Sequence, residues 1–272
     1  MAERDEADAR LAQTARTEGR HAFVVPAYGC SPFLDACLRS LKHQTEHSEI
    51  VVTTSTPSAF IDQTAHAYRI PVVLNPIRDG IAADWNFGLR ATDARYVTLA
   101  HQDDVYGEAF AERTLDAFAR HDGALCFTGY EEIDDAGCQV ASRISRVKHL
   151  LAAAAIGRRD RPSRLRLRAF LSLGNPLPCS SVTLDRRQLT DFAFSEGYAS
   201  NLDWDAWWRL IDRGERFLSV PDRLVGRRHN ALTATAGLIA DGRRRSEDLR
   251  MFRRIWPYPF SAALAALYRL SY

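Results

Sequence analysis

Tyr96-Val97-Thr98-Leu99-Ala100-His101-Gln102-Asp103-Asp104 is the stretch that decides how the rest of this sequence is interpreted. Its first part is an uninterrupted apolar run of the kind that forms a buried strand, and two adjacent carboxylates follow it. Because open α/β sheets bind ligands at the carboxyl edge of their strands, the pair would lie where a ligand is expected. Taken alone, Asp103 and Asp104 are better explained as caps of the following helix than as ligands of a cation. The remaining sequence has to decide between these two roles.

The composition is that of a globular, nearly neutral protein. With 272 residues, 46% of them apolar, the chain is long enough for one large domain with a sizeable core. Its formal net charge of +2 argues against a nucleic-acid partner. The five cysteines are scattered, odd in number and without a C-x-x-C pair, so they indicate neither a disulfide framework nor a zinc site. A reducing cytoplasm is therefore the expected compartment.

The sequence has no stretch typical of a signal peptide or a membrane span. Residues 1–20 are charged and are expected to form a flexible tail. The longest apolar patches, at 150–156 and 260–267, are much shorter than the roughly 20 residues that span a bilayer. The second patch leaves two alternatives open, which are peripheral contact with the inner face of a membrane and pairing with a second copy of the chain.

Strands and helices alternate through the first half of the sequence. Ser31-Pro32 and Thr56-Pro57 have the residue types that begin a helix, and each follows a short apolar run. The alternation, in units of about 25 to 30 residues, predicts βαβ crossovers and a parallel sheet. The expected strands are 22–27, 49–54, 70–75, 96–99 and 124–130, and the expected helices follow Ser31 and Thr56 and cover 80–92 and 108–120.

The second half of the sequence is less regular. Residues 131–174 are basic and alanine-rich, and we expect helices and a loop there that cover one side of a cleft. The simplest division is a tail at 1–20, one α/β domain at 21–226 and a helical C-terminal arm at 227–272. The remaining expected elements are a strand at 181–185, a helical segment to Phe192, a helix from Asp203 to Gly214, a strand at 216–220, a helix at 236–255 and a short helix after Pro259.

Four short motifs occur in a fixed order along this pattern: Val25-Pro26-Ala27-Tyr28, Gly80-Ile-Ala-Ala-Asp-Trp-Asn-Phe-Gly88, His101-Gln-Asp-Asp104 and Leu202-Asp-Trp-Asp-Ala-Trp-Trp-Arg-Leu210. By their order and spacing, residues 21–256 resemble the family 2 glycosyltransferases of the GT-A fold. The resemblance implies a single α/β domain whose mostly parallel, twisted sheet is flanked by helices, with a helical C-terminal arm. It also implies an inverting transfer of a sugar from a nucleotide donor.

The family's acidic motif falls on Asp103 and Asp104, which changes the balance between the two roles considered above. A departing nucleoside diphosphate develops charge on its phosphate oxygens, and Mn²⁺ or Mg²⁺ held by carboxylates stabilises that charge. The resemblance makes Asp104 the metal ligand and places Asp103 near the ribose or the donor sugar. His229 is a candidate second ligand, and Arg227 or Arg228 is a candidate contact of the diphosphate, although a histidine in an arginine-rich loop is more often simply solvated.

The nucleotide sugar is expected at the same sheet edge. The resemblance implies donor contacts from Pro26, Tyr28, Asn86 and Gln102, with the Tyr28 ring stacking on the nucleobase. Three positions depart from the family pattern. Thr53-Thr54, followed by Ser55, replace the acids after the second strand, His101 replaces the first acid of the metal motif, and Leu202 replaces the glutamate before the base. Base recognition is therefore expected to use the hydroxyls of Thr53 and Ser55, the backbone, or the Arg78-Asp79 pair.

The acceptor side is assigned to the Leu202–Leu210 motif. An acceptor hydroxyl must lose its proton as it attacks the anomeric carbon, and a nearby carboxylate can take that proton. Asp203 matches the family's base position, whereas Asp205 is better explained as the N-cap of the helix. Trp204 is expected to stack on an acceptor sugar, and Trp207 and Trp208 are expected to pack in the core.

The sequence therefore predicts an inverting, metal-dependent hexosyl- or deoxyhexosyltransferase. Its donor is a nucleotide sugar and its acceptor a glycan or lipid-linked molecule, in the synthesis of cell-surface polysaccharide or glycoconjugate. A non-catalytic sugar-nucleotide-binding or scaffold protein is an alternative, suggested by the altered Thr53-Thr54 and His101 positions. A nucleotidyltransferase is disfavoured because no glycine-rich phosphate loop lies near the N-terminus.

Overall fold

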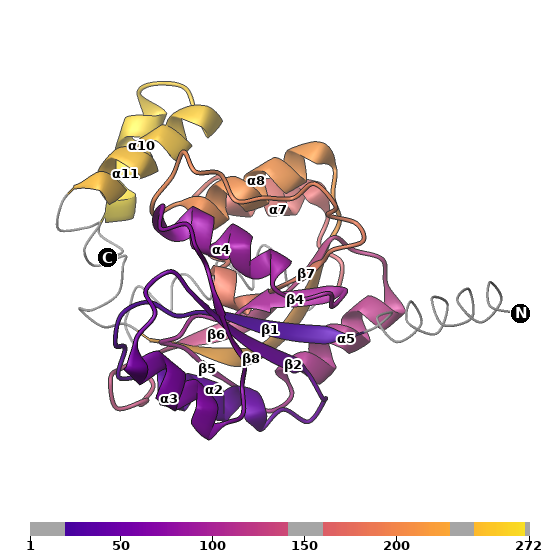
Figure 1. Cartoon of the computed structure of the whole chain (residues 1–272). Coiled ribbons are helices and arrows are strands. Elements are labelled where there is room, and N and C mark those ends of the chain that lie inside the picture. Colours follow the sequence, from indigo (N-terminus) through magenta and orange to yellow (C-terminus); the bar gives the residue numbers. More distant parts are fainter. Residues whose placement is uncertain (1–19, 141–159, 229–241, 270–272) are drawn as a thin grey trace, which may run out of the picture.

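A central eight-stranded sheet with helices on both faces organises the molecule (Figure 1). The computed structural model describes residues 20–140, 160–228 and 242–269. The strands are β1 (His21–Pro26), β2 (Glu49–Thr54), β3 (Val72–Leu74), β4 (Tyr96–Leu99), β5 (Val105–Tyr106), β6 (Leu125–Ile133), β7 (Val182–Asp185) and β8 (Phe217–Arg228). The helices are α2 (Leu34–Lys42), α3 (Ala59–Ala67), α4 (Gly80–Arg90), α5 (Phe110–Arg120), α7 (Arg164–Leu171), α8 (Leu202–Arg213), α10 (Arg243–Ile255) and α11 (Phe260–Tyr268), with a 3₁₀ turn at Cys179–Ser181.

The strand order, β3-β2-β1-β4-β7-β6-β8-β5, creates a switch point in the middle of the sheet. β1 pairs in parallel with β2 on one side and with β4 on the other. The chain leaving β1 and the chain leaving β4 therefore turn away from each other at the carboxyl edge, which is where open α/β sheets bind ligands. The acidic pair after β4 lies at this point, and the expected α/β architecture is confirmed.

Side-chain alternation along β1 divides the core into two layers. Ala22 and Val24 belong to the cluster that includes residues of α4, α7 and α8, whereas Phe23 and Val25 belong to the cluster with α2 and α3. Because successive side chains of a strand point to opposite faces, a strand that is apolar throughout has to be covered on both sides. Figure 1 shows this arrangement, with α4, α7 and α8 on one side of the sheet and α2 and α3 on the other.

Several element boundaries differ from those expected. α2 begins at Leu34 rather than after Ser31, and its N-cap residue makes no side-chain cap bond. Ser58, not Thr56, caps α3 by accepting a hydrogen bond from the Ile61 amide. Residues 186–201 form turns instead of a helix. The helix that ends at Gly214, which has a φ of 87°, and the helix after Pro259 are confirmed.

The sequence did not predict the strand directions in the second half of the sheet. β7 lies between β4 and β6 and is antiparallel to both. β8 continues through Pro221 to Arg228, beyond the expected strand and across the expected boundary at 226/227. Residues 141–159, part of the basic stretch, and the first residues of the helix expected at 236–255 lie outside the described residues. Within the described ranges, no helix combines the length and the apolar character that crossing a membrane requires.

Candidate active site

Gln102 joins the two chain segments that diverge at the switch point. Its Oε1 accepts a hydrogen bond from the Tyr28 amide at 3.0 Å, and its Nε2 donates to the Tyr28 carbonyl at 3.1 Å. Both polar atoms of this side chain are thus engaged by the backbone that follows the half-buried Pro26. Gln102 fixes the loop after β1 to the turn after β4, so its expected contact with a nucleotide sugar becomes an indirect one.

Tyr28 presents an open aromatic face beside this junction. Its side chain is 57% exposed, and Arg78 donates a hydrogen bond to the phenol oxygen at 3.2 Å. The Arg78 guanidinium lies 5.8 Å from the ring centroid. Asp79 next to it is exposed at the N-cap position of α4. An exposed ring held by a cation can take a planar, electron-rich partner on its open side.

The acidic turn leaves one buried carboxylate oxygen without a partner. The Asp104 amide donates to the His101 carbonyl at 3.1 Å, and Asp104 Oδ1 accepts from the Arg228 amide at 2.9 Å. Asp104 Oδ2 is buried and has no hydrogen-bond partner among the described residues, with His101 Nδ1 at 3.9 Å. A buried carboxylate oxygen in this state is unfavourable unless something binds it.

Asp103 is the second carboxylate of the turn. Ser31 Oγ donates a hydrogen bond to Asp103 Oδ1, so the serine expected to begin α2 instead orients this acid. Burial raises the pKa of the Asp103 carboxyl, while the hydrogen bond from Ser31 lowers it. No group of three His, Cys, Asp or Glu side chains with metal-site geometry occurs within the described ranges. One or two carboxylates nevertheless suit Mg²⁺ or Mn²⁺ when phosphate and water complete the coordination, so Asp104 Oδ2 and Asp103 fit such an ion.

Arg228 holds the acidic turn in place. Its Nε donates to the Asp103 carbonyl at 3.0 Å, its Nη1 donates to the Asp134 carbonyl, and its guanidinium lies 4.4 Å from the Phe33 ring centroid. The residue is only 6% exposed. Arg228 therefore supports the turn through Nε and Nη1, and its contact with a diphosphate stays a prediction. His229, the expected second metal ligand, lies outside the described residues.

His101 packs against aromatic residues. Its ring centroid is 5.2 Å from that of Trp85, and Trp85 in turn makes an edge contact with Phe194 at 4.9 Å. The His101 carbonyl accepts a hydrogen bond from the Cys37 thiol at 3.3 Å. The imidazole thus packs in a row of aromatic rings beside the acidic turn, and its contact with Trp85 could not be predicted from local sequence patterns.

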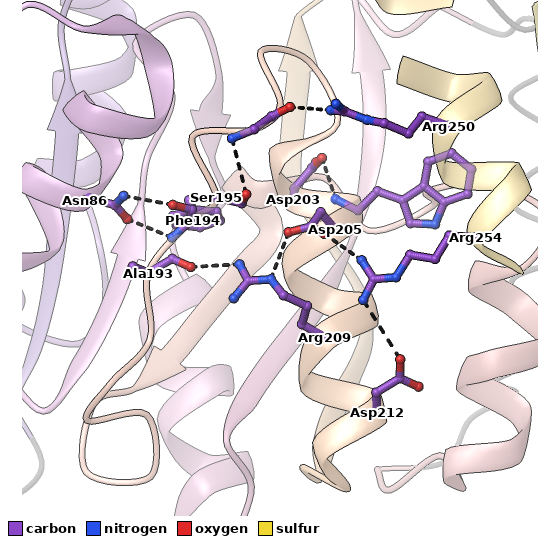
Figure 2. Close-up of polar contacts among 12 residues, drawn as sticks. Asn86, Ala193, Phe194, Ser195, Asp203, Asp205, Arg209, Asp212, Arg250 and Arg254 are labelled. Carbon is purple, nitrogen blue, oxygen red and sulfur yellow. Dashed lines mark hydrogen bonds and ion pairs between the residues drawn. The ribbon is translucent and has the colours of Figure 1, made fainter. Parts of the chain in front are cut away.

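Two of the expected nucleotide contacts are structural instead. Asn86 uses its amide twice, donating to the Phe194 carbonyl at 2.9 Å and accepting from the Phe194 amide at 2.8 Å (Figure 2). It is buried and connects α4 to the loop that precedes α8. Thr53 is 2% exposed, so its hydroxyl is too deep to read a nucleobase. The Asn86 amide is fully used by Phe194, whereas the buried Thr53 Oγ1 has no hydrogen-bond partner among the described residues.

Asp84 is a carboxylate that the sequence analysis overlooked. It accepts hydrogen bonds from Ser55 Oγ at 3.0 Å and from Asn75 Nδ2 at 2.8 Å. The carboxylate therefore lies beside the end of β2, where the acids usual in the family are replaced by threonine. Its position inside the Gly80–Gly88 motif, as the only acid of α4, is the signal that could have identified it.

Asp203 lies in the first turn of α8 and accepts a hydrogen bond from the Trp204 amide at 2.8 Å (Figure 2). Burial raises the pKa of its carboxyl, while Arg244, Arg227 and His101 oppose that shift. The pKa of the buried Cys179 thiol is raised first by burial and then by the charges of Asp203 and Asp104. The charges of both carboxylates therefore act on the same buried thiol.

The other acid and the tryptophans of α8 have supporting roles. Asp205 is not the N-cap, a position held by Asn201, but is buried and paired with Arg209 at 2.8 Å and Arg254 at 2.7 Å (Figure 2). Trp204 is fully buried, and its indole N–H donates to the Leu171 carbonyl. It has no open face for an acceptor, which corrects that expectation. The core positions expected of Trp207 and Trp208 are confirmed, since both are buried.

Comparison with known proteins relates this geometry to sugar-transferring enzymes. The family model described as glycosyl transferase family 2 matches residues 22–190. Similar solved structures include residues 1–349 of TarS from S. aureus in complex with UDP, with a TM-score of 0.60 and 15% identity, covering 78% of this chain and 61% of that one. A mannosyltransferase from Pyrobaculum calidifontis in complex with GDP-Man and Mn²⁺ has a TM-score of 0.60 and 15% identity, covering 91% and 73%.

Glucosyl-3-phosphoglycerate synthase from Mycobacterium tuberculosis, in complex with Mn²⁺, UDP and its product, has a TM-score of 0.55 and 19% identity, covering 84% of this chain and 78% of that one. The chain spans about three fifths of the length of TarS 1–349. No curated protein sequence matches it significantly. At these identities the structural likeness establishes the fold.

Proposed function

Because its residues 22–190 match the family model, the chain belongs to glycosyl transferase family 2, and we propose that it transfers a sugar from a nucleotide-sugar donor to a glycan or lipid-linked acceptor with inversion. One observation carries the proposal. Asp104 Oδ2, which is buried and has no hydrogen-bond partner among the described residues, lies at the switch point of the sheet. A metal-binding carboxylate and a general base are the two groups that this reaction needs most.

The donor half of the site is formed by the loops after β1 and β4. The open ring of Tyr28 stacks on the nucleobase, and Asp103 contacts the ribose or the donor sugar. Ser55 and Asp84 lie where a base-reading acid would otherwise follow β2. Asp104, with Asp103, would hold Mn²⁺ or Mg²⁺, which when bound neutralises the charge of the diphosphate leaving group. The Mn²⁺ complexes of the two neighbouring structures named above are consistent with this use of the acidic pair.

The acceptor half of the site centres on Asp203. The acceptor hydroxyl gives its proton to this carboxylate while its oxygen attacks the anomeric carbon from the side opposite the diphosphate. A carboxyl whose pKa is raised by burial is a stronger base than one in water. The acceptor is a glycan or lipid-linked molecule and the transferred group a hexose or deoxyhexose, in the synthesis of cell-surface polysaccharide or glycoconjugate. UDP and GDP sugars are the first donors to test, since the neighbouring structures contain UDP, UDP-GlcNAc and GDP-Man.

The test combines donor binding with turnover. A panel of nucleotide sugars is screened by thermal shift with and without Mn²⁺, since a ligand raises the apparent stability according to its affinity and concentration. For the donor that binds, Asp203→Asn should lower kcat by about 10²- to 10⁴-fold and leave the thermal shift intact. In Asp104→Ala, the part of the shift that depends on Mn²⁺ should disappear.

The dependence of kcat on pH provides a further test of the base. Only the ionised Asp203 carboxylate can accept a proton, and its pKa is raised in the fold, so kcat should fall as the pH drops through that raised value. Donor binding without hydrolysis or transfer would favour the non-catalytic alternative. Full activity in Asp203→Asn would mean that Asp203 is not the general base. Unchanged Mn²⁺ dependence in Asp104→Ala would mean that Asp104 is not a metal ligand.

A further inference from the structure

Glu247 of α10 binds three consecutive backbone amides just before α8. Its Oε1 accepts from the Ala199 amide at 2.7 Å, and its Oε2 accepts from the amides of Ser200 at 2.8 Å and Asn201 at 3.0 Å. Asn201, the N-cap residue of α8, makes no side-chain cap bond itself. The first amides of a helix and those leading into it need acceptors, and a carboxylate at this end is further favoured by the helix dipole. A side chain of α10 therefore fixes the backbone that leads into α8.

The neighbours of Glu247 on α10 reinforce this contact. Asp248, fully buried, accepts a hydrogen bond from Asn201 Nδ2 at 2.8 Å, and Arg244 Nη1 donates to Ser200 Oγ at 2.9 Å. Arg250 and Arg254 extend the contact on either side, to the Gly197 carbonyl and to Asp205 (Figure 2). α10 thus holds the whole segment from residue 197 to the start of α8, by backbone and side-chain groups together.

The candidate base follows this segment directly. Asp203 lies two residues after Asn201, so the direction in which its carboxylate points depends on how the first turn of α8 is held. Misplacement of a reacting group by about 1 Å can reduce a rate by about 100-fold. We propose that Glu247 is a positioning residue for Asp203, so that α10, which lies beyond the part of the chain matched by the family model, belongs to the catalytic apparatus. The proposal rests on the proposed function for the role of Asp203.

Glu247→Ala tests the proposal with two readouts on the full chain. Hydrogen–deuterium exchange at the amides of Ala199, Ser200 and Asn201 should accelerate, because each loses its acceptor. In the hydrolysis of the nucleotide sugar that gives the largest thermal shift, kcat should fall by about 10- to 100-fold while the donor KM changes by less than about twofold. Glu247→Gln keeps one acceptor oxygen in place and should restore part of kcat. It also carries the test if the alanine variant does not fold.

Arg253→Ala is the matched control on the same helix, because Arg253 is exposed and has no hydrogen bond or ion pair among the described residues. The amide exchange rates at residues 199–201 and the kcat of this variant should equal those of the wild type. Unchanged exchange in Glu247→Ala would overturn the hold of Glu247 on residues 199–201, and faster exchange with unchanged kcat would overturn the positioning role. A parallel loss of donor affinity and kcat would also contradict it, since it would indicate general damage. A wild-type chain without any turnover would contradict the proposed function alone, because the exchange readout needs no substrate.

Discussion

His21 is a buried histidine that must remain neutral in the folded protein. Its Nδ1 is 2.8 Å from Ser48 Oγ and its Nε2 is 2.9 Å from Thr98 Oγ1, and burial lowers its pKa to about 3. The unfolded chain binds a proton below about pH 6.5, whereas the folded protein does not until about pH 3. As the pH drops from about 6.5 to about 3, the free energy of unfolding should therefore decrease, and this residue contributes up to about 1.4 kcal/mol per pH unit.

Urea unfolding at pH 6.5, 5.5 and 4.5 measures this dependence, with His21→Gln as the test variant. The variant should be less stable at neutral pH and should show a shallower loss as the pH falls. His66→Gln is the matched control, because His66 is exposed on α3 and its replacement should leave the slope unchanged. Equal slopes in the wild type and His21→Gln would mean that another group carries the acid sensitivity.

For single residues, motifs in the sequence predicted which positions matter, but they did not predict which of those side chains lie in the core. Motifs identified Asp104, which follows β4 at the switch point, and Asp203, which lies in the first turn of α8. Their roles as metal ligand and base stay predictions. Asn86 and Trp204 were identified in the same way, but their side chains bond to the backbone of Phe194 and Leu171. A motif marks a position that the fold requires, yet it does not say whether the side chain faces a ligand or the core, because that depends on segments far away in the sequence.

Between elements, Asn86 links α4 to the loop that leads into α8. Asn86→Ala would leave both the amide and the carbonyl of buried Phe194 without partners, and each such group costs about 1–3 kcal/mol. We expect the free energy of unfolding, measured in urea, to drop by about 2–4 kcal/mol. Arg90→Ala, an exposed change in the same helix, should stay within about 0.5 kcal/mol of the wild type. Normal stability together with lost donor binding would return Asn86 to the role expected from its motif.

The elements show why local patterns predicted the first half of the fold better than the second. Each βαβ unit from β1 to β4 is built from neighbouring segments, so periodicity and helix-start residues were sufficient. The direction of β7 depends on pairing with β4 and β6, and the start of α2 depends on Ser31 turning towards Asp103. Long-range contacts of this kind leave no mark in a local window.

For the whole molecule, the decisive contact is that between the C-terminal arm and the core. Phe252 of α10 is fully buried and lies against Trp204 of α8, with ring centroids 5.1 Å apart. An arm that shares a core with the sheet domain should unfold with it, so calorimetry should record one transition. Phe252→Ala should lower the free energy of unfolding by about 3–5 kcal/mol and move that entire transition to lower temperature.

Phe260→Ala is the matched control, since Phe260 in α11 is 65% exposed and its removal should cost no more than about 0.5 kcal/mol. Two transitions in the wild type, or a second transition that appears only in Phe252→Ala, would mean that α10 and α11 fold as a separate unit. A single transition has a consequence for the active site. The contact that stabilises α10 against Trp204 then also holds Glu247 at the start of α8, so stability of the arm and placement of Asp203 cannot vary independently.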